Sequence, residues 1–171
     1  MKVSGYQIED SIDSDGNKLL LCGAGLRRKF LLNIYIASFY IEDLNVSNLD
    51  ALYGKHVKLI RMQLLLSVGS GSLISKTLKE NTKRYGIHHE PEIISLINNI
   101  EPVLEKETAS KNDCFDFVLN KKGAFCVYKN DKKLYEVKNG QTVAILILGI
   151  WLKPENNHAL RKELLHFNLQ S

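Results

Sequence analysis

The chain has 171 residues, of which 44% are hydrophobic and 25% are charged, and its formal net charge is +4. This is the composition of an ordinary globular protein, and the length predicts one domain that spans residues 1–171. The lysines are scattered beside acidic residues instead of forming a basic stripe with interleaved aromatics, which argues against nucleic-acid binding. The longest apolar run, Val143 to Leu152, has about half of the ~20 residues that a membrane-spanning helix needs, so no membrane span is expected.

The N-terminal part of the chain predicts a short strand from Val3 to Asp10 and a polar turn from Asp13 to Asn17. An apolar run from Leu19 to Cys22 follows, and it leads into Gly-Ala-Gly at positions 23 to 25. Glycine serves where the backbone takes a positive φ or passes close to something else. We therefore predict a bend at this Gly-Ala-Gly segment.

Three cations follow the predicted bend at positions 27 to 29, and a second apolar run extends from Phe30 to Ile41. This run contains no Pro or Gly and is rich in Ile, Phe and Tyr, the residues that suit a half-buried strand. Two strands joined by the bend would place Arg27 at the mouth of an apolar element. That arrangement suits an anion with an apolar tail.

The middle of the chain alternates between loops, helices and strands. The expected elements are a loop at Glu42–Ser47, one helical turn at Asn48–Tyr53, a strand at His56–Leu66, a linker at Ser67–Gly71 with Ser70 or Ser72 as N-cap, and a helix at Leu73–Tyr85 ended by Gly86. In this helix the apolar positions have helical spacing, and Asn81 falls on the same face as Ile74, seven residues earlier.

A second helix is predicted to begin at Pro91 and to be bent or ended by Pro102. Its apolar stripe has a period of about 3.6 residues. The stripe consists of Ile93, Ile94, Leu96, Ile97, Ile100 and Leu104.

The C-terminal third predicts, after a charged loop at Glu105–Asp113, a meander of three strands. The strands are expected at Cys114–Leu119, Ala124–Lys129 and Lys133–Val137, with turns at Asn120–Gly123 and Asn130–Lys132. Val143 to Leu152 is apolar on every side, so its pattern alone fits a buried strand or a buried helix. A last helix is predicted from Glu155 to Phe167 with Leu160, Leu164 and Leu165 facing inward.

The three cysteines argue against a disulfide framework because their number is odd. If Asn120–Gly123 is the turn, Cys126 lies opposite Phe117, and Cys114 lies three residues further on, facing the other way. Cys114 and Cys126 are therefore predicted to be free thiols. No C-x-x-C pair exists and His88-His89 has no partner at metal-ligand spacing, so no zinc site is expected.

Two segments resemble the chalcone isomerase family, in particular its small chalcone-isomerase-like members. The first resembles the family's Leu-x-Gly-Ala-Gly-x-Arg segment and the strand Tyr-x-Ala-x-x-Tyr that follows it. The second resembles the family's closing Ile-Trp-Leu-Gly-x-x-Pro segment and its terminal Leu-Leu helix, with Lys153 where Gly is usual. The matching residues are Leu21, Gly23, Ala24, Gly25, Arg27, Tyr35, Ala37 and Tyr40 in the first segment, and Ile150, Trp151, Leu152, Pro154, Leu160, Leu164 and Leu165 in the second.

The resemblance implies an α+β fold, an open-faced β-sandwich of the chalcone isomerase type. In it, helices pack on one face of an antiparallel sheet, and the ligand lies in a cleft between the helices and the sheet. Strands with helices grouped between them are themselves an α+β pattern. The resemblance also favours a helix for Val143–Leu152.

The family's five site positions can be carried over one at a time. In true chalcone isomerases an arginine holds an anionic phenolate or enolate, and the resemblance places it at Arg27. The strand threonine falls on Tyr35, the helix asparagine on Asn81, the helix tyrosine on Ile74, and the C-terminal threonine near Ile150. Three of the five positions have changed, and two have lost every polar atom. Ring closure needs an oriented water and a polarised carbonyl, which isoleucine side chains do not provide.

Arg27 and Tyr35 together offer a bidentate fork and a phenolic donor, a suitable clamp for a carboxylate. Fatty-acid-binding members of the superfamily use such a pair. We therefore predict a non-catalytic protein that binds a fatty acid or another anionic amphiphile through Arg27, Tyr35 and Asn81, without a cofactor. The alternatives are an isomerase of the intramolecular lyase type with an unknown substrate, and a ligand-free scaffold.

Other roles for these residues stay open at this point. Arg27 also fits a solvated turn, Tyr35 an ordinary core tyrosine, and Asn81 a core asparagine bonded to backbone. The first residues do not have the pattern of a signal peptide. Bacterial members of the family commonly carry an export signal. A periplasmic location is therefore expected if the chain is a mature form whose signal was removed, and a cytoplasmic one otherwise.

Overall fold

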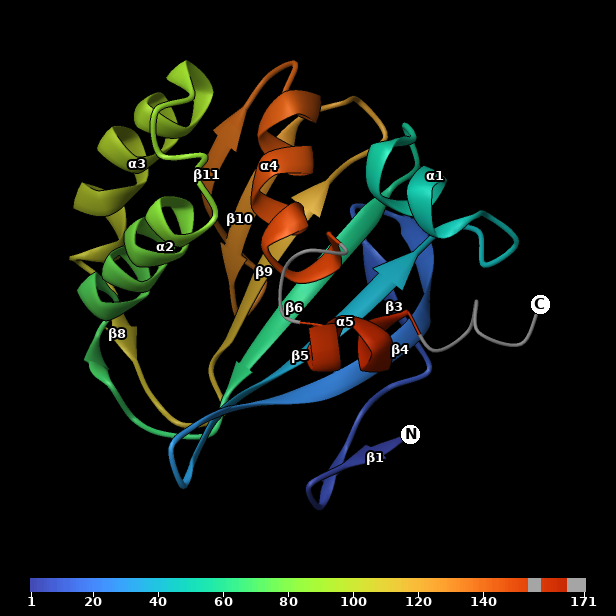
Figure 1. The fold of residues 1–171 in the computed structure, drawn as a ribbon, viewed down its shortest axis with the longest axis horizontal. Helices are drawn as coiled ribbons and strands as arrows, with labels where there is room; N and C mark the ends of the chain where they lie inside the picture. The colour runs from blue at the N-terminus through green and yellow to red at the C-terminus, as the bar shows by residue number, and fades with distance from the viewer. Residues whose placement is uncertain (154–157, 166–171) are drawn as a thin grey trace.

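The computed structural model describes residues 1–153 and 158–165 and has an α+β architecture (Figure 1). Seven antiparallel strands form one sheet in the order β11-β10-β9-β6-β5-β4-β3. These strands are β3 (Ser11–Ser14), β4 (Asn17–Lys29), β5 (Leu32–Ile41), β6 (Lys58–Leu64), β9 (Cys114–Leu119), β10 (Phe125–Lys129) and β11 (Lys132–Val137). The helices are α1 (Asn48–Tyr53), α2 (Ser72–Arg84), α3 (Pro91–Leu104), α4 (Gln141–Leu152) and α5 (His158–Leu164).

The helices α2, α3, α4 and α5 lie over one face of the sheet, as the implied open-faced sandwich requires (Figure 1). The main core lies between them and that face, because alternate residues of each strand point the same way. On β5, for example, Tyr35, Ala37 and Phe39 face the helices, whereas Ile36 and Tyr40 belong to a smaller cluster on the opposite face. This alternation decides which side chains of the central strands can reach a site beneath the helices.

The Gly-Ala-Gly segment is not a bend, so this prediction is wrong. Gly23 and Gly25 lie inside β4, and neither has a positive φ. They are required by a close approach instead: a Cβ at Gly23 would collide with the backbone carbonyl of Glu163, and one at Gly25 with the Glu163 carboxylate. The Leu26 N–H donates to that carboxylate at 3.2 Å. Glycine here lets α5 lie directly on the strand.

The true turn comes at Phe30 and Leu31, between Lys29 and its cross-strand partner Leu32. The predicted second strand is therefore correct only from Leu32 onward. The composition of Phe30, Leu31 and Leu32 favours a strand, yet Phe30 and Leu31 form the tip of the β4–β5 hairpin.

The three-stranded meander is confirmed, but the predicted register of its first hairpin is wrong by one residue. Asn120 belongs to the ladder, since its N–H donates to the Ala124 carbonyl at 3.0 Å, and the loop is closed by Gly123 at φ 74°. Cys126 therefore lies opposite Val118, on the same face as Cys114. The two cysteines are about 13 Å apart along the strands, too far for a bridge, and all three thiols are free.

The helices agree with their predicted positions, with differences at their ends. The N-cap of α2 is Gly71 rather than either serine, and α3 continues through Pro102 to Leu104. Two predicted inward residues, Leu73 and Ile94, are exposed. Val143–Leu152 is helical, as the resemblance favours, within α4.

Strands β3, β7 and β8 were not predicted, and the last helix lies partly outside the described residues. The turn expected at Asp13–Asn17 is confined to Asp15 and Gly16, because Asp13 and Ser14 pair within β3 and Asn17 begins β4. The predicted strand at Val3–Asp10 is a hairpin, β1 (Lys2–Val3) with β2 (Tyr6–Gln7), and the linker pairs with the charged loop through β7 (Gly69–Ser70) and β8 (Thr108–Ala109). Pro154 and the ends of the predicted Glu155–Phe167 helix fall outside those residues. None of the described helices is long and apolar enough to cross a membrane.

Candidate functional site

A cleft opens between α2 and the neighbouring ends of β4, β5 and β6. Its outer part is an open hollow of about 670 Å³, and its inner part is a pocket of about 60 Å³ that reaches the core. The two parts share the residues Ile34, Tyr35, Val68, Leu73, Thr77 and Asn81. Ligand pockets commonly measure ~300–1,000 Å³, so the outer part has the size of a binding site.

Arg27 and Tyr35 are brought together by strand pairing. They are direct cross-strand partners in the antiparallel β4–β5 pair, so both side chains stand on the helix-covered face. Both line the outer cleft, Arg27 half-buried and Tyr35 only 7% exposed. The pairing explains how one site can hold a cation and a phenol that are eight residues apart in the chain.

The Tyr35 hydroxyl is oriented by Trp151 of α4. The indole Nε1–H donates to Tyr35 Oη at 3.1 Å, in a buried position. Because an indole nitrogen can only donate, Tyr35 is the acceptor in this bond and its own proton stays available for a partner in the cleft. Burial raises the pKa of the Tyr35 hydroxyl, while the bond from Trp151 and the charge of Arg27 act in the opposite direction. The hydroxyl is therefore protonated at neutral pH and can donate.

One face of α2 forms the opposite wall of the cleft. The outer cleft carries more positive than negative charge on the described residues, so it favours an anion. The α2 residues in this wall recur at three- and four-residue intervals. They are Leu73, Lys76, Thr77, Glu80, Asn81 and Arg84; the cations from the strands are Arg27 and Lys29.

The inner pocket is apolar. Ile74 and Leu78 of α2 face Met62 and Phe117 of the sheet across it, and Trp151 also contributes to its lining. At about 60 Å³ it holds on the order of two water molecules. The cleft thus changes from a cationic mouth to a narrow apolar end, a polarity gradient that matches an amphiphile with an acidic head.

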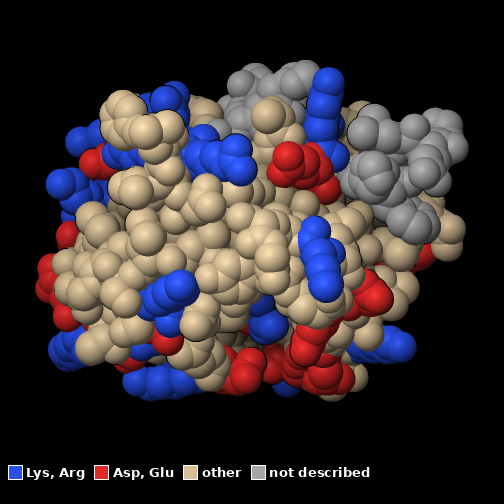
Figure 2. All heavy atoms as spheres, turned by 90° about the horizontal axis from the view of Figure 1, so that it is seen from below, with Lys and Arg blue, Asp and Glu red and all other residues tan. Residues whose placement is uncertain are grey.

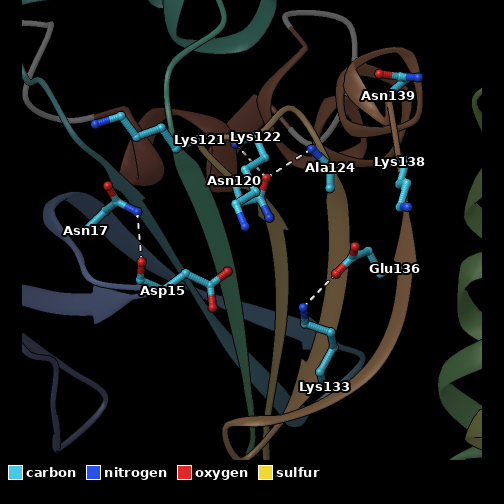
Figure 3. A pocket seen from close by; sticks show the side chains of 10 residues that line it. All are labelled: Asp15, Asn17, Asn120, Lys121, Lys122, Ala124, Lys133, Glu136, Lys138 and Asn139. Carbon is cyan, nitrogen blue, oxygen red and sulfur yellow. Dashed lines mark hydrogen bonds and ion pairs between the residues drawn. The ribbon is translucent and has the colours of Figure 1, made fainter.

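A second hollow on the opposite side of the molecule is larger, and nearly all of its lining residues are polar or charged. It measures about 790 Å³ and lies between the β9–β10 hairpin and the turn before β4 (Figure 3). Within it, Lys133 and Glu136 pair with each other at 2.6 Å, and Asn120 accepts hydrogen bonds from its own loop. Of its described lining residues only Ala124 is apolar, so it offers little apolar surface to a hydrophobic ligand.

The predicted site residues lie together in this cleft. Arg27, Tyr35 and Asn81 line its outer part, and Asn81 makes no side-chain hydrogen bond to any described residue, so it is not the backbone-bonded core asparagine considered above. Ile74 lines the inner pocket, whereas Ile150 lines neither part; its neighbour Trp151 does. Within the described chain, no three His, Cys, Asp or Glu side chains are placed to hold a metal ion.

Sequence reasoning missed four contributors to the site. They are Trp151, which entered the prediction only as part of the family resemblance, Lys29, which was noted only as one of three adjacent cations, and Lys76 and Arg84, which were not considered. The two α2 cations could have been found, because they stand five before and three after Asn81 on the same helical face. No local signal connects Trp151 with Tyr35, since 116 positions separate them.

Comparisons with known proteins agree with this architecture. A family profile described as chalcone isomerase-like matches residues 1–166. Among solved structures, a fatty-acid-binding protein from Arabidopsis thaliana superposes with a TM-score of 0.72 at 16% identity, covering 97% of this chain and 92% of the plant protein. At that identity the likeness establishes a shared fold. No curated protein sequence matches the chain.

Proposed function

The chain belongs to the chalcone isomerase-like family, and from that premise we propose that it binds a fatty acid or a similar anionic amphiphile without turning it over. The observation that carries the proposal is the pairing of Arg27 with Tyr35 at the mouth of an apolar cleft. The structural neighbour from Arabidopsis thaliana is itself a fatty-acid-binding protein, which supports the same reading.

In this proposal the carboxylate lies between Arg27 and Tyr35. The guanidinium donates a charge-assisted pair of hydrogen bonds, and the Tyr35 proton, directed away from Trp151, donates a third. Asn81 completes the head-group contacts from α2. The acyl chain then runs along Ile34, Val68 and Leu73 toward the inner pocket.

The dimensions of the cleft set the order in which chain lengths fit. The outer part accommodates a medium-length chain as it stands, whereas the inner part is too small for further methylene groups. A longer chain requires the inner wall to move, and Met62 is the residue most able to adapt because its unbranched side chain has several rotamers. Medium-chain acids should therefore bind with the least rearrangement.

The test measures two ligands against two proteins by calorimetry or by displacement of a fluorescent probe. Wild type should bind a medium-chain fatty acid, and Arg27→Ala should weaken that binding roughly tenfold to a hundredfold, since a hydrogen bond to a charged group contributes about 1.5–3 kcal/mol. The matching fatty alcohol should bind wild type poorly and respond little to Arg27→Ala. Equal binding of acid and alcohol would remove the clamp from the proposal.

The same site argues against isomerase activity. The position that corresponds to the enzymes' helix tyrosine is Ile74, which faces the inner pocket without a polar atom. We expect no chalcone-to-flavanone conversion above background in an absorbance assay. A decay of chalcone absorbance that scales with protein and disappears in Arg27→Ala would establish the isomerase alternative instead.

A further inference from the structure

The tip of the β4–β5 hairpin exposes three large apolar side chains in a row. Phe30 is 91% exposed, Leu31 99% and Leu32 57%, and Lys29 pairs with Leu32 so that only two residues form the turn. The hairpin projects from the lower edge of the molecule in Figure 1. Exposed single apolar residues are common, but three consecutive ones at a projecting tip mark an interaction site.

The conformation of Phe30 shows that the fold does not demand this residue. Its φ is 55°, in the left-handed region that a bulky side chain rarely adopts. The other described non-glycine residues with positive φ are all Ser, Asp or Asn, the types that tolerate it. An aromatic residue occupies this position against its conformational preference, which points to a role outside the protein's own packing.

Cations stand directly behind the apolar tip. Arg28 and Lys29 precede it and are exposed, and Arg28 is steadied by a hydrogen bond from Nε to Asn33 Oδ1 at 3.2 Å. Figure 2 shows the molecule from this end: Lys and Arg side chains predominate over Asp and Glu at the upper left, and Asp and Glu side chains are densest at the lower right. An apolar tip with a basic collar complements a lipid surface that carries negative charge.

We propose that residues 28–32, the docking tip, attach the protein to anionic lipid bilayers. Phe30, Leu31 and Leu32 insert at the level of the headgroups and upper acyl chains, while Arg28 and Lys29 meet the lipid phosphates. A two-residue turn is too narrow for a protein interface, which typically buries about 800 Å² per partner. A fluid bilayer, by contrast, closes around a small convex tip.

The docking tip adjoins the mouth of the cleft. Lys29 lines the outer cleft, as does Arg27, which precedes it by two residues in β4. A protein held at the bilayer by the tip presents the cleft to the lipid surface, where fatty acids partition. This consequence rests on the proposed function, whereas bilayer attachment itself does not.

The test is partitioning of the full chain onto vesicles without added fatty acid. Wild type should co-sediment with phosphatidylcholine vesicles that contain phosphatidylglycerol and far less with phosphatidylcholine alone. Leu31→Ser should weaken partitioning on the order of tenfold. Replacing Arg28 and Lys29 by Gln should weaken vesicle binding about fivefold for each charge removed, and it should remove most of the salt dependence of that binding.

Two further variants separate docking from folding. Phe30→Asn should lower vesicle binding while raising the melting temperature, because Asn suits the positive φ. Leu49→Ser, at a site on α1 that is 66% exposed, is the matched control and should leave vesicle binding unchanged. If wild type, Leu31→Ser and Phe30→Asn partition equally, the proposal is overturned. A concentration-dependent dimer that Leu31→Ser abolishes, without vesicle binding, would overturn it in favour of a second copy.

The outcomes distinguish this inference from the proposed function. Leu31 does not line the cleft, so Leu31→Ser should keep the affinity of wild type for a soluble medium-chain acid. Tyr35→Phe should keep wild-type partitioning onto vesicles. Wild-type protein that binds vesicles but no fatty acid would refute only the clamp, and wild-type protein that binds fatty acid but not vesicles would refute only the docking tip.

Discussion

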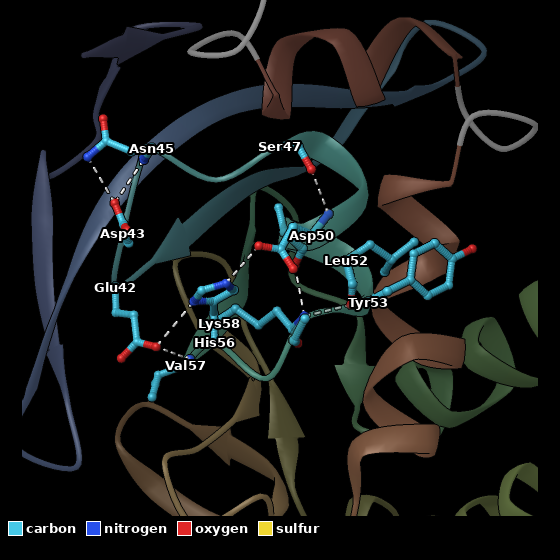
Figure 4. Close-up of polar contacts among 12 residues, drawn as sticks. Glu42, Asp43, Asn45, Ser47, Asp50, Leu52, Tyr53, His56, Val57 and Lys58 are labelled. Atoms are coloured by element: carbon cyan, nitrogen blue, oxygen red, sulfur yellow. Dashed lines mark hydrogen bonds and ion pairs between the residues drawn. The ribbon is translucent and has the colours of Figure 1, made fainter.

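Two cations near the helix-covered face of the sheet, Lys58 and Arg27, occupy opposite kinds of site. Lys58 is fully buried at the start of β6, and its ammonium group donates to the carbonyls of Ala51, Leu52 and Gly54 at 2.6–2.9 Å (Figure 4). These carbonyls belong to the end of α1, where a helix lacks internal donors. All three protons of the ammonium are thus used by the protein itself.

A second polar layer encloses Lys58. His56 lies between Glu42 and Asp50, with its Nε2 at 3.1 Å from Asp50 Oδ2 and its Nδ1 at 3.5 Å from Glu42 Oε1 (Figure 4). The Glu42 carboxylate also accepts from the Val57 N–H at 3.0 Å. The polar groups beside Lys58 are thus paired within the protein.

Arg27 differs because it lies beside open space. Its neighbour Tyr35 retains a proton to donate, and both line a cleft of about 670 Å³. The comparison teaches that burial of a cation does not identify a binding site. Lys58 is the more deeply buried of the two, but its donors are saturated by α1, so its role is to hold that helix against the sheet.

The largest expected effect tests Lys58 as a structural residue. Lys58→Met should lower the free energy of unfolding by about 3 kcal/mol, because three buried carbonyls lose their donor. Urea denaturation measures the difference. Lys55→Met, at an exposed position in the loop before β6, is the control and should stay within about 0.5 kcal/mol of wild type. A loss as large in Arg27→Ala would contradict the comparison.

The pH dependence of stability sharpens the same point. Burial lowers the pKa of Lys58 to about 8, and the negative charge of Asp50 opposes that shift. Below pH 8 both the folded and the unfolded chain hold the proton, so the folded state bears the full cost of the buried charge. Above it the folded state releases the proton first, and linkage then raises stability with pH.

Between pH 7 and 10, wild type should therefore gain about 2 kcal/mol relative to Lys58→Met. The difference between the two proteins isolates Lys58, because the cysteines and tyrosines titrate alike in both. Denaturation at four or five pH values supplies the curve. A constant difference across this range would mean that the Lys58 ammonium is not destabilised by its burial.

The open space beside Arg27 is tested by filling it. Thr77 lines both parts of the cleft, and among the described residues its hydroxyl bonds only to the Leu73 carbonyl within α2. Thr77→Phe should weaken fatty-acid binding about tenfold, equivalent to ~1.4 kcal/mol, and change stability by less than about 1 kcal/mol. Lys83→Phe puts the same side chain on the exposed side of α2 and should bind like wild type. Undiminished binding by Thr77→Phe would place the ligand elsewhere.

How far the sequence could predict the fold depended on whether a signal was local. Hydrophobic periodicity located α2, α3 and the meander, because each pattern repeats within one element. The Gly-Ala-Gly segment was misread because its cause is tertiary: Glu163 approaches β4 from 138 positions beyond Gly25. Phe30 was misread because composition cannot show a turn that is built from apolar residues.

The candidate site shows the same limit. Family resemblance was enough to select Arg27, Tyr35 and Asn81, which the fold brings to one cleft. It could not show that the Tyr35 hydroxyl accepts a hydrogen bond from Trp151, because that contact depends on how α4 packs on the sheet. Nor could it show that Lys58 is saturated, since its acceptors are backbone carbonyls, which no sequence pattern marks.

The smallest expected effect concerns that shared hydroxyl. Tyr35→Phe removes one neutral donor to the ligand, so acid binding should weaken by about 1 kcal/mol, roughly fivefold, much less than in Arg27→Ala. It also leaves the buried Trp151 N–H without its acceptor, so the free energy of unfolding should fall by about 1–3 kcal/mol.

Trp151→Phe is the matched variant: it removes the hydrogen bond to Tyr35 without removing Tyr35 itself. Among the described residues, the indole nitrogen has Tyr35 as its only partner. If Trp151 orients the hydroxyl, Trp151→Phe should nevertheless weaken acid binding, through its effect on Tyr35. Acid binding that is lost in Tyr35→Phe but untouched in Trp151→Phe would show that the hydroxyl finds its direction from the ligand alone.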